Sequence, residues 1–177
     1  MKFCSKCGSK VSIEIPTGDN RLRAVCSNCK TIHYENPKIV VGCLSTWENK
    51  ILLCKRAIEP RLGFWTLPAG FLELNESTEE GAIRETIEES GAKIALGALF
   101  AIFDLPFCNQ VHMFFLAKML NPSLDPGIES LEAKLFPINQ IPWSQLSFTS
   151  VKKTIKLFIN TDEKKFNKVH TELIKIK

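Results

Sequence analysis

Residues 70–92 decide the fold and read GFLELNESTEEGAIRETIEESGA. Ser77 is followed three residues later by Glu80, and this capping-box pattern marks the start of a helix. Gly91 suits the left-handed residue that commonly ends one. The stretch therefore predicts a loop, then a helix over residues 78–90, then a sharp stop.

Three glutamates crowd together on one side of this expected helix. At about 100° per residue, Glu85, Glu88 and Glu89 lie roughly 200°, 140° and 240° from Ile83. Ile83 and Ile87 then form a modestly apolar face, together with Thr86, on the opposite side.

Two interpretations of the acidic face are open. The first is an ordinary solvated face. The second is a cation site, because the acids lie toward the C-terminal half of the helix, where the macrodipole disfavours negative charge. Gly81 also lowers helix stability unless space is needed beside it. Mg²⁺ or Mn²⁺ would resolve both problems, since these ions prefer oxygen ligands and are often completed by substrate phosphates.

Four of the seven cysteines form two Cys-x-x-Cys pairs, Cys4 with Cys7 and Cys26 with Cys29, separated by 18 residues. This spacing is typical of a four-thiolate zinc site, in which two tight knuckles complete a tetrahedron. Disulfides in a secreted protein are the alternative, and the odd cysteine count disfavours them. We expect a small structural zinc ribbon whose folding depends on the metal.

The stretch 70–92 resembles the Nudix box, Gly-x5-Glu-x7-Arg-Glu-U-x-Glu-Glu-x-Gly-U, in which U is a bulky apolar residue. Every invariant polar and glycine position matches. The departures are Thr86 and Ala92, which are small for the two U positions and leave the acids untouched.

The whole chain up to about residue 160 is most similar to zinc-ribbon Nudix proteins of the plant chloroplast FAD and ADP-ribose pyrophosphatase type and their bacterial relatives. The similarity rests on segments such as YENPK at 34–38, WTLPAG at 65–70 and ESLE at 129–132. NADH pyrophosphatases are more distant, because their Ser-Gln-Pro-Trp-Pro-Phe-Pro segment is absent and residues 103–107 read FDLPF.

This resemblance implies roles for particular residues. The catalytic set is Glu85, Glu88 and Glu89 as Mg²⁺ or Mn²⁺ ligands, with a main-chain carbonyl from Ala69 or Gly70. Glu132 is a candidate further ligand or general base, with an ordinary exposed loop residue as the alternative. The remaining box residues are structural: Gly70, Gly91 and a Glu76–Arg84 salt bridge that ties the loop to the helix. Arg56 and Arg61 are candidates to pair with a diphosphate, with surface charge as the alternative.

The domain organisation expected is a zinc ribbon over residues 1–35, a Nudix domain over 36–160 and a Lys-rich tail over 161–177. The resemblance implies an α/β/α sandwich with a mixed sheet for the Nudix domain. Apolar runs predict its strands, and a second helix is expected near its end; in chain order these elements lie near 39–44, 51–54, 94–104, 111–119, 135–136 and 149–159.

Composition excludes several classes of protein. The 177 residues are 45% hydrophobic and 24% charged, which is ordinary for a globular chain, and no apolar run is long enough to span a membrane. The net charge of +4 comes from the C-terminal end, a pattern more typical of a solvated helix face than of nucleic-acid binding. No apolar leader follows Met1, so we expect a cytoplasmic location, or an organelle if a targeting segment has been removed.

The expected activity is metal-dependent hydrolysis of the pyrophosphate bond in nucleoside diphosphate-X compounds. FAD and ADP-ribose are the leading substrates, each giving AMP and an X-phosphate. The alternatives are NADH or capped-RNA hydrolysis and a non-catalytic nucleotide sensor. A small nucleotide is the expected partner, and the resemblance implies a homodimer.

Overall fold

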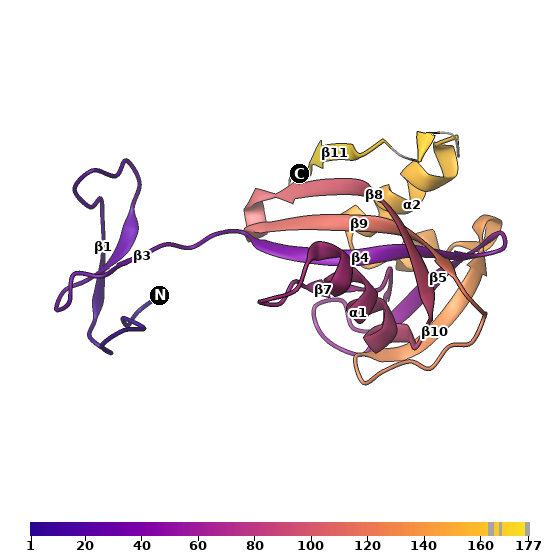
Figure 1. The fold of residues 1–177 in the computed structure, drawn as a ribbon, viewed down its shortest axis with the longest axis horizontal. Helices are drawn as coiled ribbons and strands as arrows, with labels where there is room; N and C mark the ends of the chain where they lie inside the picture. Colours follow the sequence, from indigo (N-terminus) through magenta and orange to yellow (C-terminus); the bar gives the residue numbers. More distant parts are fainter. Residues whose placement is uncertain (163–164, 167, 176–177) are drawn as a thin grey trace. The chain divides into compact units, whose positions relative to one another are not determined.

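The computed structural model describes residues 1–162, 165–166 and 168–175, and its contacts divide the chain at Asn36 into two compact units (Figure 1). The first unit is Met1–Asn36 and the second is Pro37–Lys177. Each unit has its own sheet.

The first unit is a three-stranded antiparallel sheet in the order β1-β2-β3. Its strands are β1 (Val11–Glu14), β2 (Arg23–Cys26) and β3 (Ile32–His33). Val11 pairs with Cys26, which brings the two cysteine knuckles to the same end of the sheet. Besides Cys4 and Cys26, only Ala24 and Val25 are buried apolar residues here, so this unit has little core of its own.

The second unit contains an eight-stranded mixed sheet in the order β10-β5-β4-β9-β8-β11, with β6 paired to β5 and β7 paired to β4. The β4–β9 and β8–β11 pairs are parallel and the other pairs are antiparallel. The strands are β4 (Lys38–Trp47), β5 (Lys50–Arg56), β6 (Trp65–Thr66), β7 (Ala69–Phe71), β8 (Ile94–Leu105), β9 (Gln110–Met119), β10 (Ser130–Pro137) and β11 (His170–Leu173).

One helix covers each face of this sheet: α1 (Thr78–Ser90) and α2 (Thr149–Asn160) (Figure 1). Successive residues of a strand point to opposite faces. Leu44 therefore packs with Phe114 and Ile155 on the α2 side. Its neighbour Cys43 packs with Ala82 on the α1 side. The result is the expected α/β/α sandwich.

The predicted elements are confirmed where local pattern was strong. The helix over 78–90 has the predicted bounds, and the second helix is Thr149–Asn160. Each predicted strand lies within an observed one, β4, β5, β8, β9 or β10.

The predicted apolar face of α1 is confirmed at Thr86 and wrong at Ile87. Ile87 is 48% exposed, whereas Gly81, Ala82, Thr86 and Glu89 are buried. The reason is close packing: a Cβ on Gly81 would come within 2.9 Å of Val41 Cγ2 on β4. Small residues let the helix approach the sheet, so the small side chain of Thr86 fits where a bulky one was expected.

The C-terminal end contributes to the second unit. β11 pairs in parallel with β8, and Ile174 is buried in the core on the α2 side. Residues 163–164, 167 and 176–177 of the predicted Lys-rich tail lie outside the described residues. Within the described ranges, no helix is long and apolar enough to cross a membrane.

Candidate functional site

The loop and helix at residues 70–91 are held by local hydrogen bonds. Ser77 Oγ accepts from Glu80 N at 3.2 Å, and Glu80 Oε2 accepts from Ser77 N at 2.8 Å, which completes the capping box. Gly91 ends the helix with φ of 67°, and its N–H donates to Ile87 O at 2.7 Å. The acids of α1 are therefore presented from a rigid element.

Arg84 joins this loop to the helix. Its Nε and Nη2 donate to the two carboxylate oxygens of Glu76 at 2.9 and 2.8 Å, and Nη2 also donates to Phe71 O at 3.1 Å. This pairing lowers the pKa of Glu76 to about 2. Nη1 donates to Glu85 and Glu88 at 2.8 and 3.0 Å, so one guanidinium orients three carboxylates.

Glu89 and Glu85 are acids withdrawn from water. Glu89 is 6% exposed, and burial raises its pKa to about 8, with a further contribution from the charge of Glu85. Its Oε2 accepts from Ala69 N at 3.3 Å. Burial also raises the pKa of Glu85. A Cβ on Gly70 would overlap the Glu85 carboxylate, so glycine is required where the main chain meets this acid. Glu88 is the exposed member, with 58% of its side chain accessible.

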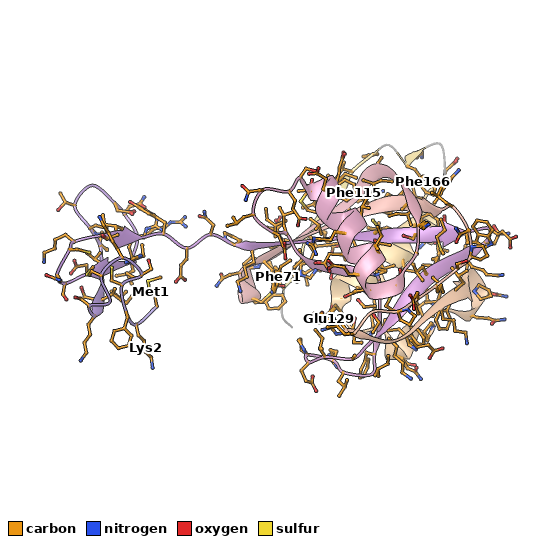
Figure 2. The ribbon with its side chains drawn as sticks, turned by 60° about the horizontal axis from the view of Figure 1, so that its bottom comes forward. Met1, Lys2, Phe71, Phe115, Glu129 and Phe166 are labelled. Carbon is orange, nitrogen blue, oxygen red and sulfur yellow. The ribbon has the colours of Figure 1, made fainter. Side chains whose placement is uncertain are left out.

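These acids line one wall of a cavity of about 960 Å³. Phe71 and Glu129, labelled in Figure 2, also line it. The sequence-predicted residues that the cavity brings together are Arg56, Arg61, Ala69, Gly70, Arg84, Glu85, Glu88 and Glu89. Glu76 lies behind this wall and acts on it through Arg84.

Glu132 does not line the cavity, and Glu129 does. A register shift in β10 separates Ser130 from Glu132, which lies opposite Lys55 of β5 as an exposed residue. Glu129 precedes the strand, and its carbonyl accepts from Ala57 N at 2.8 Å. Its charge contributes to the raised pKa values of Glu85 and Glu89, which line the same cavity. Sequence spacing offers no means of choosing between two glutamates three residues apart at a β-bulge.

The α1 acids fit a hard divalent cation by the chemistry of their donors. Three carboxyl groups lie beside the main chain of residues 69–70, and a divalent cation would favour the ionised form of the two whose pKa values burial raises. Among the described residues their oxygens are not gathered as closely as the cysteine sulfurs, and Arg84 Nη1 donates to both Glu85 and Glu88. A bound cation would compete with Arg84 for these two acids.

The four cysteines of the first unit form a second candidate metal site. Their sulfur atoms all lie within 4.8 Å of one another, with Sγ–Sγ distances of 3.5 Å for Cys7–Cys26 and Cys7–Cys29 and 3.7 Å for Cys4–Cys29. A tetrahedral zinc with bonds of ~2.3 Å places sulfurs about 3.8 Å apart, so the set fits zinc. None of the four is in a disulfide.

Groups around the sulfurs act in both directions: burial raises the pKa of Cys4 to about 11, whereas main-chain and hydroxyl donors favour the thiolate form. Lys6 N and Cys29 N donate to Cys4 and Cys26 sulfurs, each at 3.4 Å. Hydrogen bonds from Thr31 lower the pKa of Cys29 to about 6. His33, to which sequence reasoning assigned no role, has Nε2 at 3.3 Å from Cys4 Sγ. No spacing signal marks this histidine, because β3 brings it across the sheet.

Family models match both units. Residues 2–35 match the zinc-ribbon model described as Nudix N-terminal, and residues 36–157 match the NUDIX domain. A crystal structure of a NUDIX hydrolase from Nitrosomonas europaea is 48% identical, with a TM-score of 0.93 over 98% of this chain and 99% of that one.

Curated relatives share part of their length with this chain. The NAD-capped RNA hydrolase NudC of Vibrio atlanticus is 31% identical over 145 residues, which are 80% of this chain and 51% of the relative. The ADP-ribose pyrophosphatase of Methanocaldococcus jannaschii is 31% identical over 113 residues, 62% of this chain and 67% of the relative. The chain thus spans about half the length of the NudC relatives that it matches.

Proposed function

The chain belongs to the Nudix family, and on this premise we propose that it hydrolyses the pyrophosphate bond of a nucleoside diphosphate linked to a second group. The observation that supports this is the meeting of Glu85, Glu88 and Glu89 with the main chain of residues 69–70 in one wall of the cavity. Arg56 and Arg61 line the same cavity and supply positive charge for the diphosphate.

Different residues of the chain have different roles in this reaction. The α1 acids would hold Mg²⁺ or Mn²⁺, which when bound neutralise the phosphate oxygens and lower the pKa of a water molecule. Arg84 contacts two of these acids and keeps their carboxylates oriented. Glu129, which lines the cavity, would accept the proton of the attacking water, one of the two roles that the family resemblance implied for Glu132. The oxygen of the water bonds to one phosphorus, the P–O–P bridge breaks, and two monophosphates leave.

ADP-ribose and FAD are the substrates that we place first. ADP-ribose would give AMP and ribose 5-phosphate, and FAD would give AMP and FMN. The likeness to the Methanocaldococcus jannaschii ADP-ribose pyrophosphatase favours the former. The likeness to the NudC relatives favours an NAD-type cap as the second candidate.

A hydrolysis panel tests the proposal. The full chain is incubated with ADP-ribose, FAD, NADH and NAD-capped RNA, each with Mg²⁺ and with Mn²⁺, and AMP or 5′-phosphate release is measured. Glu88→Gln should lose most turnover, roughly 100-fold or more, because it removes a charged ligand. Glu79→Gln is the matched control, since Glu79 is an exposed glutamate of the same helix outside the cavity.

Two outcomes would count against the proposal. Full turnover in Glu88→Gln would refute the ligand assignment. Nucleotide binding without hydrolysis of any of the four compounds would favour the sensor alternative. A homodimer, expected from the family likeness, stays a prediction that light scattering of the full chain can check.

A further inference from the structure

The two helices of the second unit begin in chemically different ways. α1 starts with a capping box and two acidic residues in its first turn. α2 starts after Phe148, whose side chain makes no capping hydrogen bond, and its first turn contains no acidic residue. The unpaired N–H groups of a first turn carry partial positive charge, so the start of α2 keeps a positive end that no side chain neutralises. This end of the helix lies on the cavity wall, which is lined by Phe148, Thr149 and Val151.

Ser147 adds an unpartnered polar group at the same place. It lines the cavity and is only 6% exposed. Among the residues that the structure describes, its Oγ has no hydrogen-bond partner. Its main-chain N–H donates to Trp65 O at 2.8 Å, so the residue itself is held in position. A buried hydroxyl without a partner costs free energy, and a ligand oxygen that accepts from it would recover that cost.

Arg56 brings a full positive charge to this part of the wall. Its guanidinium carbon lies 5.2 Å from the centre of the Phe148 ring, beside the residue from which α2 begins. Nε donates to Pro60 O at 2.8 Å. None of the ion pairs in the described part of the chain involves Arg56, so its remaining N–H groups are available to a ligand.

We propose that the first turn of α2, the Ser147 hydroxyl and Arg56 form an anion subsite that binds one phosphoryl group of the substrate and retains the monophosphate product. The inference rests on the proposed function and extends it, because it assigns the two phosphates to two different walls. The α1 acids repel a bare phosphate and hold one only through cations. The α2 wall offers main-chain N–H, hydroxyl and guanidinium donors, which bind a phosphate without a metal.

Phosphate binding without Mg²⁺ or Mn²⁺ is therefore the test. The zinc-loaded full chain is titrated with inorganic phosphate and with AMP, and the amide signals of residues 149–151 are followed by NMR. We expect saturable shifts at these amides. Arg56→Gln should weaken binding roughly tenfold, since a charge-assisted hydrogen bond is lost. Lys55→Gln, one residue earlier on β5 and outside the cavity, should bind as the wild type does.

A paired substitution at the first residue of α2 isolates the main-chain donor. Thr149→Pro deletes one N–H, and proline is tolerated at the first helical position. Phe148 has φ of −123° and ψ of 151°, the extended conformation that a residue before proline adopts. Thr149→Ala keeps the N–H and sets the reference. We expect Thr149→Pro to bind phosphate several-fold more weakly than Thr149→Ala, and Ser147→Ala to bind more weakly than the wild type.

The outcomes separate this inference from the proposed function. Equal phosphate affinity in Arg56→Gln, Thr149→Pro and the wild type would overturn the subsite, as would shifts confined to other amides. Hydrolysis without any metal-free binding of phosphate or AMP would refute the subsite alone. Binding at residues 149–151 in a chain that hydrolyses none of the panel would support the subsite and refute the function.

Discussion

Acid should destabilise the second unit through one buried histidine, His112 of β9. His112 is 8% exposed, and burial lowers its pKa from 6.5 to about 4. Its Nδ1 lies 3.0 Å from Ser150 Oγ, and its Nε2 lies 2.9 Å from Gln110 Oε1, so the neutral ring is held by two polar partners.

The sign of the effect follows from where the proton binds. Between the folded and unfolded pKa values, the unfolded chain binds a proton that the folded chain does not, so the free energy of unfolding falls as pH drops below about 6.5. With a pKa of 6.5 in the unfolded chain and about 4 in the folded one, the free energy of unfolding falls by about 2 kcal/mol between pH 7 and pH 5. It stops falling through this group once the pH is well below the folded pKa of about 4.

The assay is urea unfolding of the wild type and of His112→Gln at pH 7 and pH 5, followed by tryptophan fluorescence. All three tryptophans lie in residues 37–177, so the fluorescence reports unfolding of the second unit and not of the zinc ribbon. Glutamine keeps a polar side chain but does not titrate. The wild type should lose about 2 kcal/mol more than the variant over this interval. Equal losses in the two proteins would refute the reasoning.

Three further predictions concern the loop, the helix and the ribbon. Gly70→Ala should lower kcat at least tenfold in the hydrolysis assay with the circular dichroism spectrum kept, because its Cβ displaces the Glu85 carboxylate; unchanged kcat would contradict the close approach. Arg84→Lys should lower both kcat and the melting temperature, because an ammonium cannot make the two-pronged bond to Glu76; a variant with wild-type values would show that the fork is dispensable. Removing zinc should unfold residues 1–36, seen as collapse of their NMR signals, while the tryptophan fluorescence of the second unit stays native; persistence of the ribbon signals without metal would exclude zinc-dependent folding.

The different positions of Glu129 and Glu132 could not be predicted from local pattern, since only Glu129 lines the cavity. Both residues lie in one short segment before and within β10, and both are exposed. Only the register of β10 against β5, including the irregularity after Ser130, determines which of them lines the cavity. That register depends on pairing between segments more than 70 residues apart, which no local spacing records.

The buried side of α1 was also only partly predictable from the sequence. Hydrophobicity favoured Ile83 and Ile87 beside Thr86 as the contact face, yet Ile87 is exposed and Ala82 and Glu89 are buried with Thr86. A helix that lies close to a sheet selects for small side chains at the contact, so burial there follows distance rather than hydrophobicity. An acid on this side becomes buried, and its raised pKa follows from that position.

Local interactions account for what could be read from the chain alone. The bounds of α1 follow from a cap and a glycine within a few residues of the helix, and the cysteine site follows from two short knuckles. Contacts between distant segments decide the cavity and the place of Glu129 on its wall. They also decide the place of Arg56 beside the uncapped start of α2 and the burial of His112. Such contacts exist only once the sheet is assembled, because strand order and register are properties of the whole fold.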